Sequence, residues 1–347
     1  MVSTLAADVV WHRLNDDFPF VTRCVYLNTA AAGVSWSGQG QAAAAFYDDA
    51  KSLGFNGMAR WRGMAARARA SIARLVGCSE SEIRFVGSTT EGLNLIVSSM
   101  AWRSGDEIVF ADDEFPSVVA ACERAVSAGV TARRVHISKE REREAALAAA
   151  ITSATRMVAV SHVHWATGTR IDVARLASLC DAVGATLLVD GVQALGAAPV
   201  TLGSAHAYCA SVFKWLLSGF GLAVLIVREP LQRQLAPVAR GYNNPAPATE
   251  LQYSHINYPG ICALAAARLR RAGVRLAARL RPRRVVDGRA DHRTRGRGSV
   301  CGHATTGARR HRELRRCPPG RYARCACCSC DLRGIARGLS PRFPAFL

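Results

Sequence analysis

The sequence has 347 residues, half of them hydrophobic, which is enough for one large folded domain or two ordinary ones. No apolar run approaches the ~18 residues that a membrane helix needs. Residues 1–20 lack the basic start and apolar stretch of a signal peptide. We therefore expect a cytoplasmic protein that makes no contact with a membrane.

The net charge of +19 is concentrated at one end of the chain. Residues 1–267 hold 23 Lys and Arg against 22 Asp and Glu, whereas residues 268–347 hold 22 Arg, no Lys and 4 acids. Six of the 12 cysteines also fall in this last segment. The other six are scattered singly, which is typical of a reducing compartment. The composition predicts an N-terminal segment 1–25, a folded domain 26–267 and an Arg/Cys-rich tail 268–347.

Three interpretations of this tail remain open. The first is a basic segment that binds nucleic acid. The second is a cysteine-rich metal site, and the third is a GC-rich reading frame translated out of register. We favour the frameshift because charge, lysine usage and cysteine usage all change near one point. We expect no metal, since the last four cysteines lack the two-pair spacing of a zinc site: Cys325, Cys327, Cys328 and Cys330. The tail is therefore not expected to fold natively.

The domain is predicted to begin with helices and to continue with alternating strands and helices. An apolar period of 3.6 residues predicts helices over 39–53, 63–76, 90–100, 116–127, 140–151 and 173–183. Runs rich in Val, Ile and Leu predict strands over 107–111, 134–137, 157–163, 186–190, 207–212 and 222–227. Unbroken apolar strands are typical of a parallel sheet covered on both faces. The predicted fold is α/β, with a mostly parallel sheet covered by helices.

One lysine occupies an unusual position. Lys214 is one of only three lysines in the chain, and it lies between the predicted strand 207–212 and a glycine-containing turn. Partial burial there would lower its pKa and make it a usable amine nucleophile. A surface lysine that extends from a strand end is the alternative for Lys214 taken alone.

A carboxylate ends another predicted strand. Asp190 closes the run 186–190, and the carboxyl edge of an open α/β sheet is where ligands bind. Such a carboxylate can pair with a protonated ring nitrogen, and Gln193 can donate to a phenolic oxygen. An Asp that caps the following turn is the alternative.

Small hydroxyl residues open the predicted helix 90–100. Free N–H groups at a helix start, with hydroxyls beside them in Gly87-Ser-Thr-Thr-Glu, make an anion site for a phosphate. An ordinary N-cap is the alternative. A lysine for a Schiff base, an acid for a pyridine nitrogen and a phosphate pocket are together the parts that pyridoxal 5'-phosphate (PLP) chemistry requires.

The order of these motifs resembles the class V aminotransferase family, which includes cysteine desulfurases, selenocysteine lyases and isopenicillin-N-epimerase-like proteins. The motifs are Thr-Thr-Glu at 89–91, Asp-Gly-x-Gln at 190–193 and Ser-x-Phe-Lys at 211–214. Segments 26–33 and 161–168 are similar to the family's as well. The resemblance covers about 26–267 and implies the large PLP-binding catalytic domain of PLP-transferase fold type I.

The resemblance implies roles for the central residues. Lys214 is implied to form the Schiff base with PLP and to move protons at the α-carbon of the substrate. Asp190 is implied to pair with the pyridine nitrogen, and Gln193 to contact the phenolic oxygen.

The same resemblance implies the surroundings of the cofactor. Thr89, Thr90 and Ser211 are implied to bind the phosphate. Phe115 matches the position that stacks on the ring, where desulfurases carry His, and Trp165 falls near a position where they carry Asn. These two aromatics make the chain look more like the epimerase-like or selenocysteine-lyase-like branch. Their interpretation as ordinary core aromatics stays open.

The chain departs from the family after residue 267. We expect the family's small C-terminal domain, which usually supplies an arginine for the substrate carboxylate, to be missing or replaced here. The resemblance implies a PLP-dependent transferase or lyase that acts on an amino acid as a homodimer, by transamination, β-elimination or epimerisation. A catalytically incomplete remnant and nucleic-acid binding through the basic tail are the alternatives.

Overall fold

The computed structural model describes residues 16–137, 143–203, 205–245 and 250–267. The three interpretations of the tail, the expected absence of a metal there and the start of the predicted helix 140–151 lie outside the described residues. All described residues belong to one unit defined by its contacts, residues 1–285. The division into segments 1–25, 26–267 and 268–347 stays a prediction.

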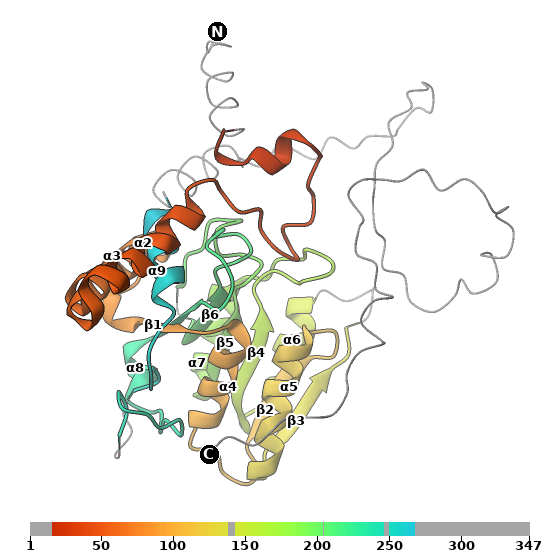
Figure 1. Ribbon diagram of the computed structural model, residues 1–347. Coiled ribbons are helices and arrows are strands. Elements are labelled where there is room, and N and C mark those ends of the chain that lie inside the picture. The colour runs from red at the N-terminus through yellow and green to blue at the C-terminus, as the bar shows by residue number, and fades with distance from the viewer. Residues whose placement is uncertain (1–15, 138–142, 204, 246–249, 268–347) are drawn as a thin grey trace, which may run out of the picture. The chain divides into compact units, whose positions relative to one another are not determined.

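A seven-stranded sheet forms the centre of this unit, in the order β1-β7-β6-β5-β4-β2-β3 (Figure 1). The strands are β1 (Ile83–Val86), β2 (Glu107–Ala111), β3 (Thr131–Val135), β4 (Thr155–Ser161), β5 (Thr186–Asp190), β6 (Ala207–Ser211) and β7 (Ala223–Val227). The strands β3, β2, β4, β5 and β6 run parallel, while β7 is antiparallel to β6 and to β1. The predicted α/β fold with a mostly parallel sheet is confirmed.

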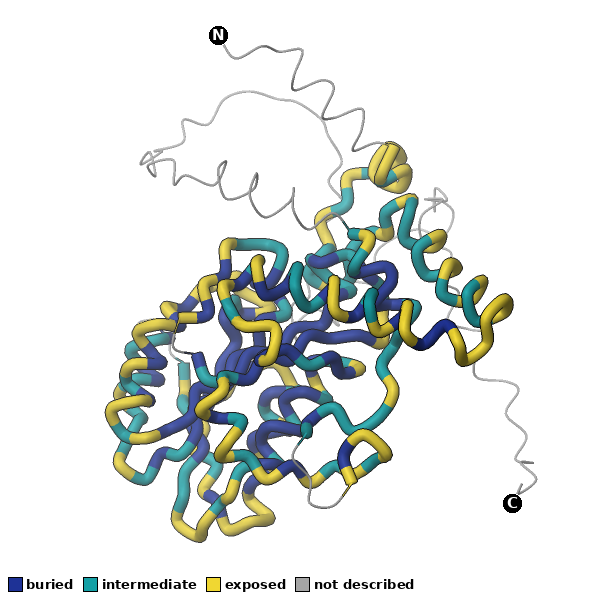
Figure 2. Tube along the Cα trace, turned by 90° about the vertical axis from the view of Figure 1, so that its left-hand side faces the viewer, coloured by how far each residue is buried: buried dark blue, intermediate teal, exposed yellow. Residues whose placement is uncertain are grey.

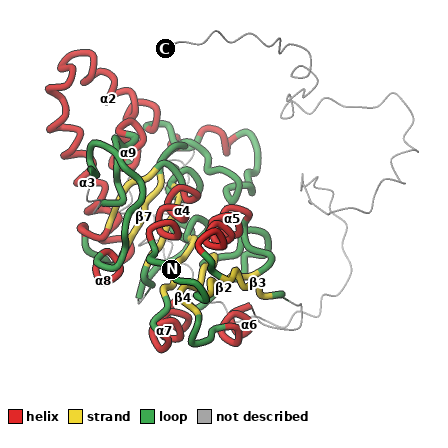
Figure 3. The backbone as a smooth tube through the Cα atoms, turned by 90° about the horizontal axis from the view of Figure 1, so that it is seen from below, coloured by secondary structure: helices red, strands yellow, loops and turns green. Residues whose placement is uncertain are grey.

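Helices cover both faces of the sheet. Figure 3 shows α4 and α5 on one side of the strands and α6 and α7 on the other. The helices are α2 (Gln39–Leu53), α3 (Met58–Val76), α4 (Thr89–Ser99), α5 (Pro116–Arg124), α6 (Arg143–Ala150), α7 (Val173–Val183), α8 (Glu229–Gln232) and α9 (Tyr258–Ala266). Short 3-10 helices are η1 (Pro19–Thr22), η2 (Gly54–Gly57), η3 (Glu80–Glu82) and η4 (Ala125–Ala128). None of the helices in the described ranges is long and apolar enough to span a bilayer.

The core divides into one cluster on each face of the sheet. Leu93 of α4 and Val118 of α5 pack with Leu188 of β5, whereas Leu176 of α7 packs with Val189 on the opposite face. Figure 2 shows the buried residues gathered in the interior of the domain. Each such fully buried Leu or Val stabilises the fold by about 1.5–3 kcal/mol relative to an exposed one. The sheet is therefore a rigid platform for the loops at its edges.

Several element boundaries differ from the sequence predictions. The strand predicted at 134–137 is β3, which begins at Thr131, and three of its five residues are exposed. β3 is an edge strand, so its apolar signal is weak. The four-residue β1 is too short for an apolar period and was not predicted. The reversed direction of β7 also has no sequence signal, because apolar content does not depend on strand direction.

Polar residues meet at the carboxyl edge of the sheet. In the register of the parallel strands Ser161 of β4 lies beside Asp190 of β5, and Asp190 lies beside Cys209 of β6. Ser211 ends β6 two residues later. The edge predicted to bind a ligand thus gathers these side chains from three neighbouring strands.

Candidate active site

Lys214 lies in the loop that follows β6. Its half-buried side chain places Nζ 5.7 Å from the centre of the Phe115 ring and 5.8 Å from that of Phe213. Burial lowers the pKa of this amine, and the attraction of Asp190 opposes that shift. Lys214 therefore loses its proton more readily than a solvated lysine does, as a nucleophilic amine requires.

The backbone of this loop, residues 212–222 and called the lysine loop below, is strained and closely packed. Leu217 has a φ of 52°, a left-handed conformation that a leucine adopts only when its surroundings impose it. The N–H of Gly33 donates to the carbonyl of Phe213 at 3.0 Å, and a Cβ on residue 33 would lie 2.0 Å from the carbonyl oxygen of Lys214. Only glycine fits there, so the N-terminal segment 26–33 packs directly on the lysine loop.

Asp190 is a buried carboxylate with 3% of its surface exposed. Its Oδ1 accepts a hydrogen bond of 2.9 Å from the N–H of Val192. Burial raises the pKa of Asp190 to about 7, against the effects of that hydrogen bond and of Lys214. No cationic side chain within the described ranges forms an ion pair with it. A buried carboxylate of this kind fits a cationic group that a ligand supplies.

Gln193, which follows β5, contacts both the N-terminal segment and the lysine loop. Its Nε2 donates to the carbonyl of Ala30 at 3.0 Å, and its Oε1 accepts from Nε1 of Trp215 at 2.8 Å. These two contacts fix the orientation of the amide between the N-terminal segment and the lysine loop. Because the amide nitrogen carries two hydrogens, one donor is left for a ligand.

Thr89 and Ser211 hold each other by reciprocal hydrogen bonds. The N–H of Thr89 donates to Oγ of Ser211 at 2.9 Å, and the N–H of Ser211 donates to Oγ1 of Thr89 at 2.8 Å. Both residues are 7% exposed. The start of α4 is thereby locked to the end of β6, and two of the three predicted phosphate-binding residues are brought together.

The third of these residues, Thr90, has a different partner. Its Oγ1 lies 2.8 Å from Oγ of Ser117 in the first turn of α5, so the N-termini of α4 and α5 adjoin. The N-cap of α4 is Ser88, and the N–H of Thr90 has no acceptor among the described residues. The helix start keeps a free donor, as an anion site requires. Sequence reasoning missed Ser117, although a Pro-Ser pair is a helix-start signal.

Replacing Ser211 with alanine is expected to destabilise the protein by about 1–2 kcal/mol, because the buried N–H of Thr89 loses its acceptor. Urea unfolding monitored by circular dichroism measures this change. Ser178→Ala is the control, since Ser178 bonds only to the Ala174 carbonyl on the exposed surface of α7. Equal midpoints for Ser211→Ala and Ser178→Ala would contradict the structural role of this pair.

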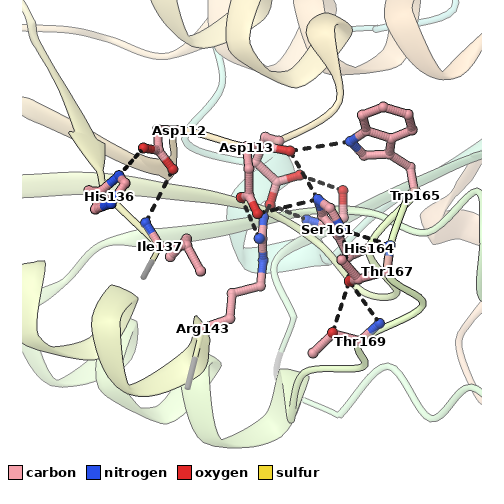
Figure 4. Close-up of polar contacts among 11 residues, drawn as sticks. Asp112, Asp113, His136, Ile137, Arg143, Ser161, His164, Trp165, Thr167 and Thr169 are labelled. Carbon is pink, nitrogen blue, oxygen red and sulfur yellow. Dashed lines mark hydrogen bonds and ion pairs between the residues drawn. The ribbon is translucent and has the colours of Figure 1, made fainter. Parts of the chain in front are cut away.

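Phe115 and Trp165 form an aromatic pair beside Lys214. Their ring centres lie 5.9 Å apart at an interplanar angle of 75°. Phe115 is 37% exposed and Trp165 is 46% exposed, so neither is a core residue. The Nε1 of Trp165 donates to the carbonyl of Asp113 at 3.2 Å (Figure 4). The pair forms an apolar wall at the carboxyl edge of the sheet.

A buried histidine behind Asp190 was missed from the sequence. The backbone N–H of His162 donates to the backbone carbonyl of Asp190. The ring Nδ1 of His162 lies 3.2 Å from Oη of Tyr208. Arg170 donates to its Nε2 at 3.4 Å. Burial, and after it the charge of Arg170, lowers the pKa of His162 to about 4, so the ring is neutral. The only signal was a histidine at the end of an apolar run.

Comparisons with known proteins identify similar sequences. The sequence model described as Aminotransferase class-V matches residues 25–259. Isopenicillin N epimerase of Streptomyces clavuligerus is 31% identical over 178 residues, which are 49% of this chain and 45% of that protein. Cysteine desulfurase of Escherichia coli O6:K15:H31 is 28% identical over 246 residues, 65% of this chain and 60% of that protein. The chain thus spans 45% and 60% of the length of these two relatives, which is less than two thirds of either.

The solved structures that match share this fold. The complex of the cystine C-S lyase C-DES with its product cysteine persulfide superposes with a TM-score of 0.67 at 22% identity, over 73% of each chain. The cysteine desulfurase CsdA from Escherichia coli superposes with a TM-score of 0.66 at 22% identity, over 75% of this chain and 70% of that one.

Proposed function

Because the chain belongs to the class V aminotransferase family, we propose that it is a PLP-dependent enzyme of the transferase or lyase type that acts on an amino acid. One observation carries the proposal: a buried Asp190, without an ion-pair partner in the described part of the chain, lies at the same sheet edge as a half-buried Lys214. A protonated pyridine nitrogen would supply the positive partner at contact distance that Asp190 lacks.

The residues present fit this cofactor. Lys214 would hold its aldehyde carbon, Asp190 its ring nitrogen, Gln193 its phenolic oxygen and Phe115 one face of its ring. The phosphate would be held by hydroxyls at the start of α4 and the end of β6: Thr89, Thr90 and Ser211. When bound, PLP supplies an electron sink for the substrate carbon from which a bond is broken.

The protein groups then have simple tasks. Nζ of Lys214 takes a proton from the substrate α-carbon or returns one to it, and its lowered pKa favours the unprotonated amine that accepts this proton. Asp190 stays ionised once a cation lies against it, because an opposite charge at contact favours the carboxylate. Trp165 and Phe115 would exclude water from the side of the site that they line.

We also propose that the enzyme is a cytoplasmic homodimer. The cysteines in the described ranges are all free, which supports a reducing compartment. Large apolar side chains are exposed in the loop between β6 and β7 and at the start of the N-terminal segment that packs on it, including Phe220 at 70%, Val25 at 86% and Leu27 at 81%. Such exposed apolar groups favour contact with a second chain.

The absorbance spectrum of the full-length chain with PLP tests the proposal. A band from bound PLP that survives dialysis and shifts with an amino acid supports it, and soluble protein with neither property contradicts it. A panel of amino acids then separates the reaction types. A keto acid with transfer of the amino group marks transamination, a released side-chain fragment marks elimination, and conversion between L and D forms marks epimerisation.

A catalytically incomplete remnant is the second candidate. Helix α2 has no buried residue, and Tyr47 and Phe55 are 62% and 73% exposed. An open hollow of about 410 Å³ lies between α2, α9 and the lysine loop. These exposed apolar groups favour a face that a further part of a complete enzyme would cover. Soluble oligomers that turn over an amino acid would rule this candidate out, whereas PLP binding without turnover would favour it.

A further inference from the structure

We propose that Arg143, the first residue of α6, positions Phe115 and Trp165 at the active site. Arg143 is a positioning residue, since its contacts are with Asp113 and Glu114 rather than with Lys214 or Asp190. The inference rests on the proposed function in one respect, namely that the aromatic pair covers bound PLP.

Arg143 bridges two consecutive carboxylates. Its side chain is only 5% exposed, NH2 lies 2.7 Å from Oε1 of Glu114, and NH1 forms an ion pair with Asp113. Figure 4 shows the guanidinium between α6 and the turn that follows β2. Its buried Nε has no hydrogen-bond partner among the described residues, so the side chain acts through its two terminal nitrogens. A planar guanidinium makes these contacts through two nitrogens held in a fixed geometry, whereas a lysine offers a single nitrogen on a flexible chain.

Glu114 carries this constraint to the next strand. Its side chain is fully buried, Oε1 accepts the N–H of Ser161 at 3.0 Å, and Oε2 accepts the hydroxyl of Ser161 at 2.5 Å. Ser161 in turn lies beside Asp190 in the sheet register. The charge of Arg143 compensates a carboxylate that burial would otherwise destabilise, and this holds the ends of β2 and β4 together.

Asp113 carries the constraint to Trp165. Its carbonyl oxygen accepts from Nε1 of Trp165 at 3.2 Å and faces Nε2 of His164 at 2.9 Å (Figure 4). The N–H of Thr167 donates to Nδ1 of His164, so His164 carries its proton on Nε2 and donates it to Asp113. The Asp113 turn therefore has a side chain fixed by Arg143 and a carbonyl that fixes the indole.

The two aromatic rings consequently depend on one turn. Phe115 follows Glu114 directly and is the N-cap of α5, and its ring meets that of Trp165 edge to face. A shift of the turn at 113–114 moves Phe115 through the chain and Trp165 through its hydrogen bond. Arg143 holds that turn through its ion pairs with Asp113 and Glu114.

The test compares full-length Arg143→Lys and Arg143→Met with a matched control. Arg175→Met removes another arginine–glutamate pair, in which the exposed Arg175 lies 2.9 Å from Glu144, the residue next to Arg143. We expect Arg143→Lys to keep its far-ultraviolet circular dichroism and to weaken PLP binding by roughly 10-fold, as a small displacement of contact groups does. Arg175→Met should bind PLP like the parent protein. If Arg143→Met fails to fold, Arg143→Lys alone decides the test.

A double-mutant cycle with Trp165→Phe distinguishes positioning from a general loss of structure. Because only part of the effect passes through the indole, Arg143→Lys should weaken PLP binding by less in the Trp165→Phe background than in the parent protein, and the loss that remains reflects Phe115. Full additivity of the two changes, or parental affinity in a folded Arg143→Lys, would overturn the inference.

A second readout does not depend on the cofactor. The near-ultraviolet dichroism of each protein, minus that of its Trp165→Phe counterpart, isolates the signal of Trp165. We expect Arg143→Lys to diminish this signal in protein without PLP, and an unchanged signal would overturn the inference. Failure of the parent protein to bind PLP would refute the proposed function, while this arm would still test the role of Arg143.

Discussion

Replacing Lys214 with alanine is expected to abolish the covalent labelling of the protein by PLP and borohydride. The side chain is half-buried, its pKa is lowered by burial, and its Nζ lies 5.7 and 5.8 Å from the ring centres of Phe115 and Phe213. Since this amine is also the proposed proton carrier, turnover should fall by at least about 100-fold, the usual contribution of a positioned acid or base. Mass spectrometry of the reduced protein locates the label.

Lys51→Ala is the matched control for this change. Lys51 is exposed in the last turn of α2, so it should neither be labelled specifically nor affect turnover. The lowered pKa of Lys214 means that folding disfavours its charged form at neutral pH, so Lys214→Ala should melt no lower than the parent protein there. A folded Lys214→Ala that is still labelled and active would disprove the assignment.

The sequence was sufficient to predict that Asp190 ends a buried strand. Asp190 closes β5, and its position follows from an apolar run that stops at a polar residue. Ser211 was assigned only through the family resemblance, since the predicted strand 207–212 runs one residue past it, whereas β6 ends at Ser211. The ends of parallel strands meet at one edge, so proximity could be predicted as well. The hydroxyls of Thr89 and Thr90 were also placed correctly at the start of a helix, which begins one residue earlier than predicted.

The supporting contacts could not be predicted in the same way. Glu114 lies in the turn after β2, Ser161 ends β4 47 residues later, and Arg143 begins α6. No local sequence period connects these three residues. Each residue taken alone is typical of a turn or of a helix surface. Their pairing depends on how α6 packs against the ends of the neighbouring strands β2 and β4, which only the folded chain determines. Ser117 was missed for the same reason, because its partner Thr90 lies 27 residues earlier.

Replacing Asp190 with asparagine is expected to affect stability and function in opposite directions. Without PLP, burial raises the pKa of Asp190 to about 7, well above the value of about 3.8 in an unfolded chain. The folded protein therefore holds this proton more tightly, which favours folding below pH 4. That advantage is lost as the pH rises to 7. The ionised carboxylate then destabilises the protein by about 2–4 kcal/mol.

Asparagine removes this charge and keeps an oxygen for the Val192 N–H. At pH 8 Asp190→Asn should thus raise the melting temperature of the PLP-free protein by at least about 2 °C, and by less at pH 5. Glu114→Gln is the control with the opposite sign, since Arg143 neutralises Glu114 and loses that partner. Differential scanning calorimetry at the two pH values measures both changes.

The same substitution should weaken function, because a neutral amide cannot keep a pyridine nitrogen protonated. Turnover by Asp190→Asn is expected to fall by about 100-fold or more, with PLP still attached to Lys214. A melting temperature that falls at pH 8 would show that Asp190 has a cationic partner in the protein itself. The charge of Asp190 would then serve the fold rather than the cofactor. A rise in melting temperature together with a loss of turnover would mean that the buried, unpaired charge of Asp190 lowers the stability of the free protein but is required for catalysis with bound PLP.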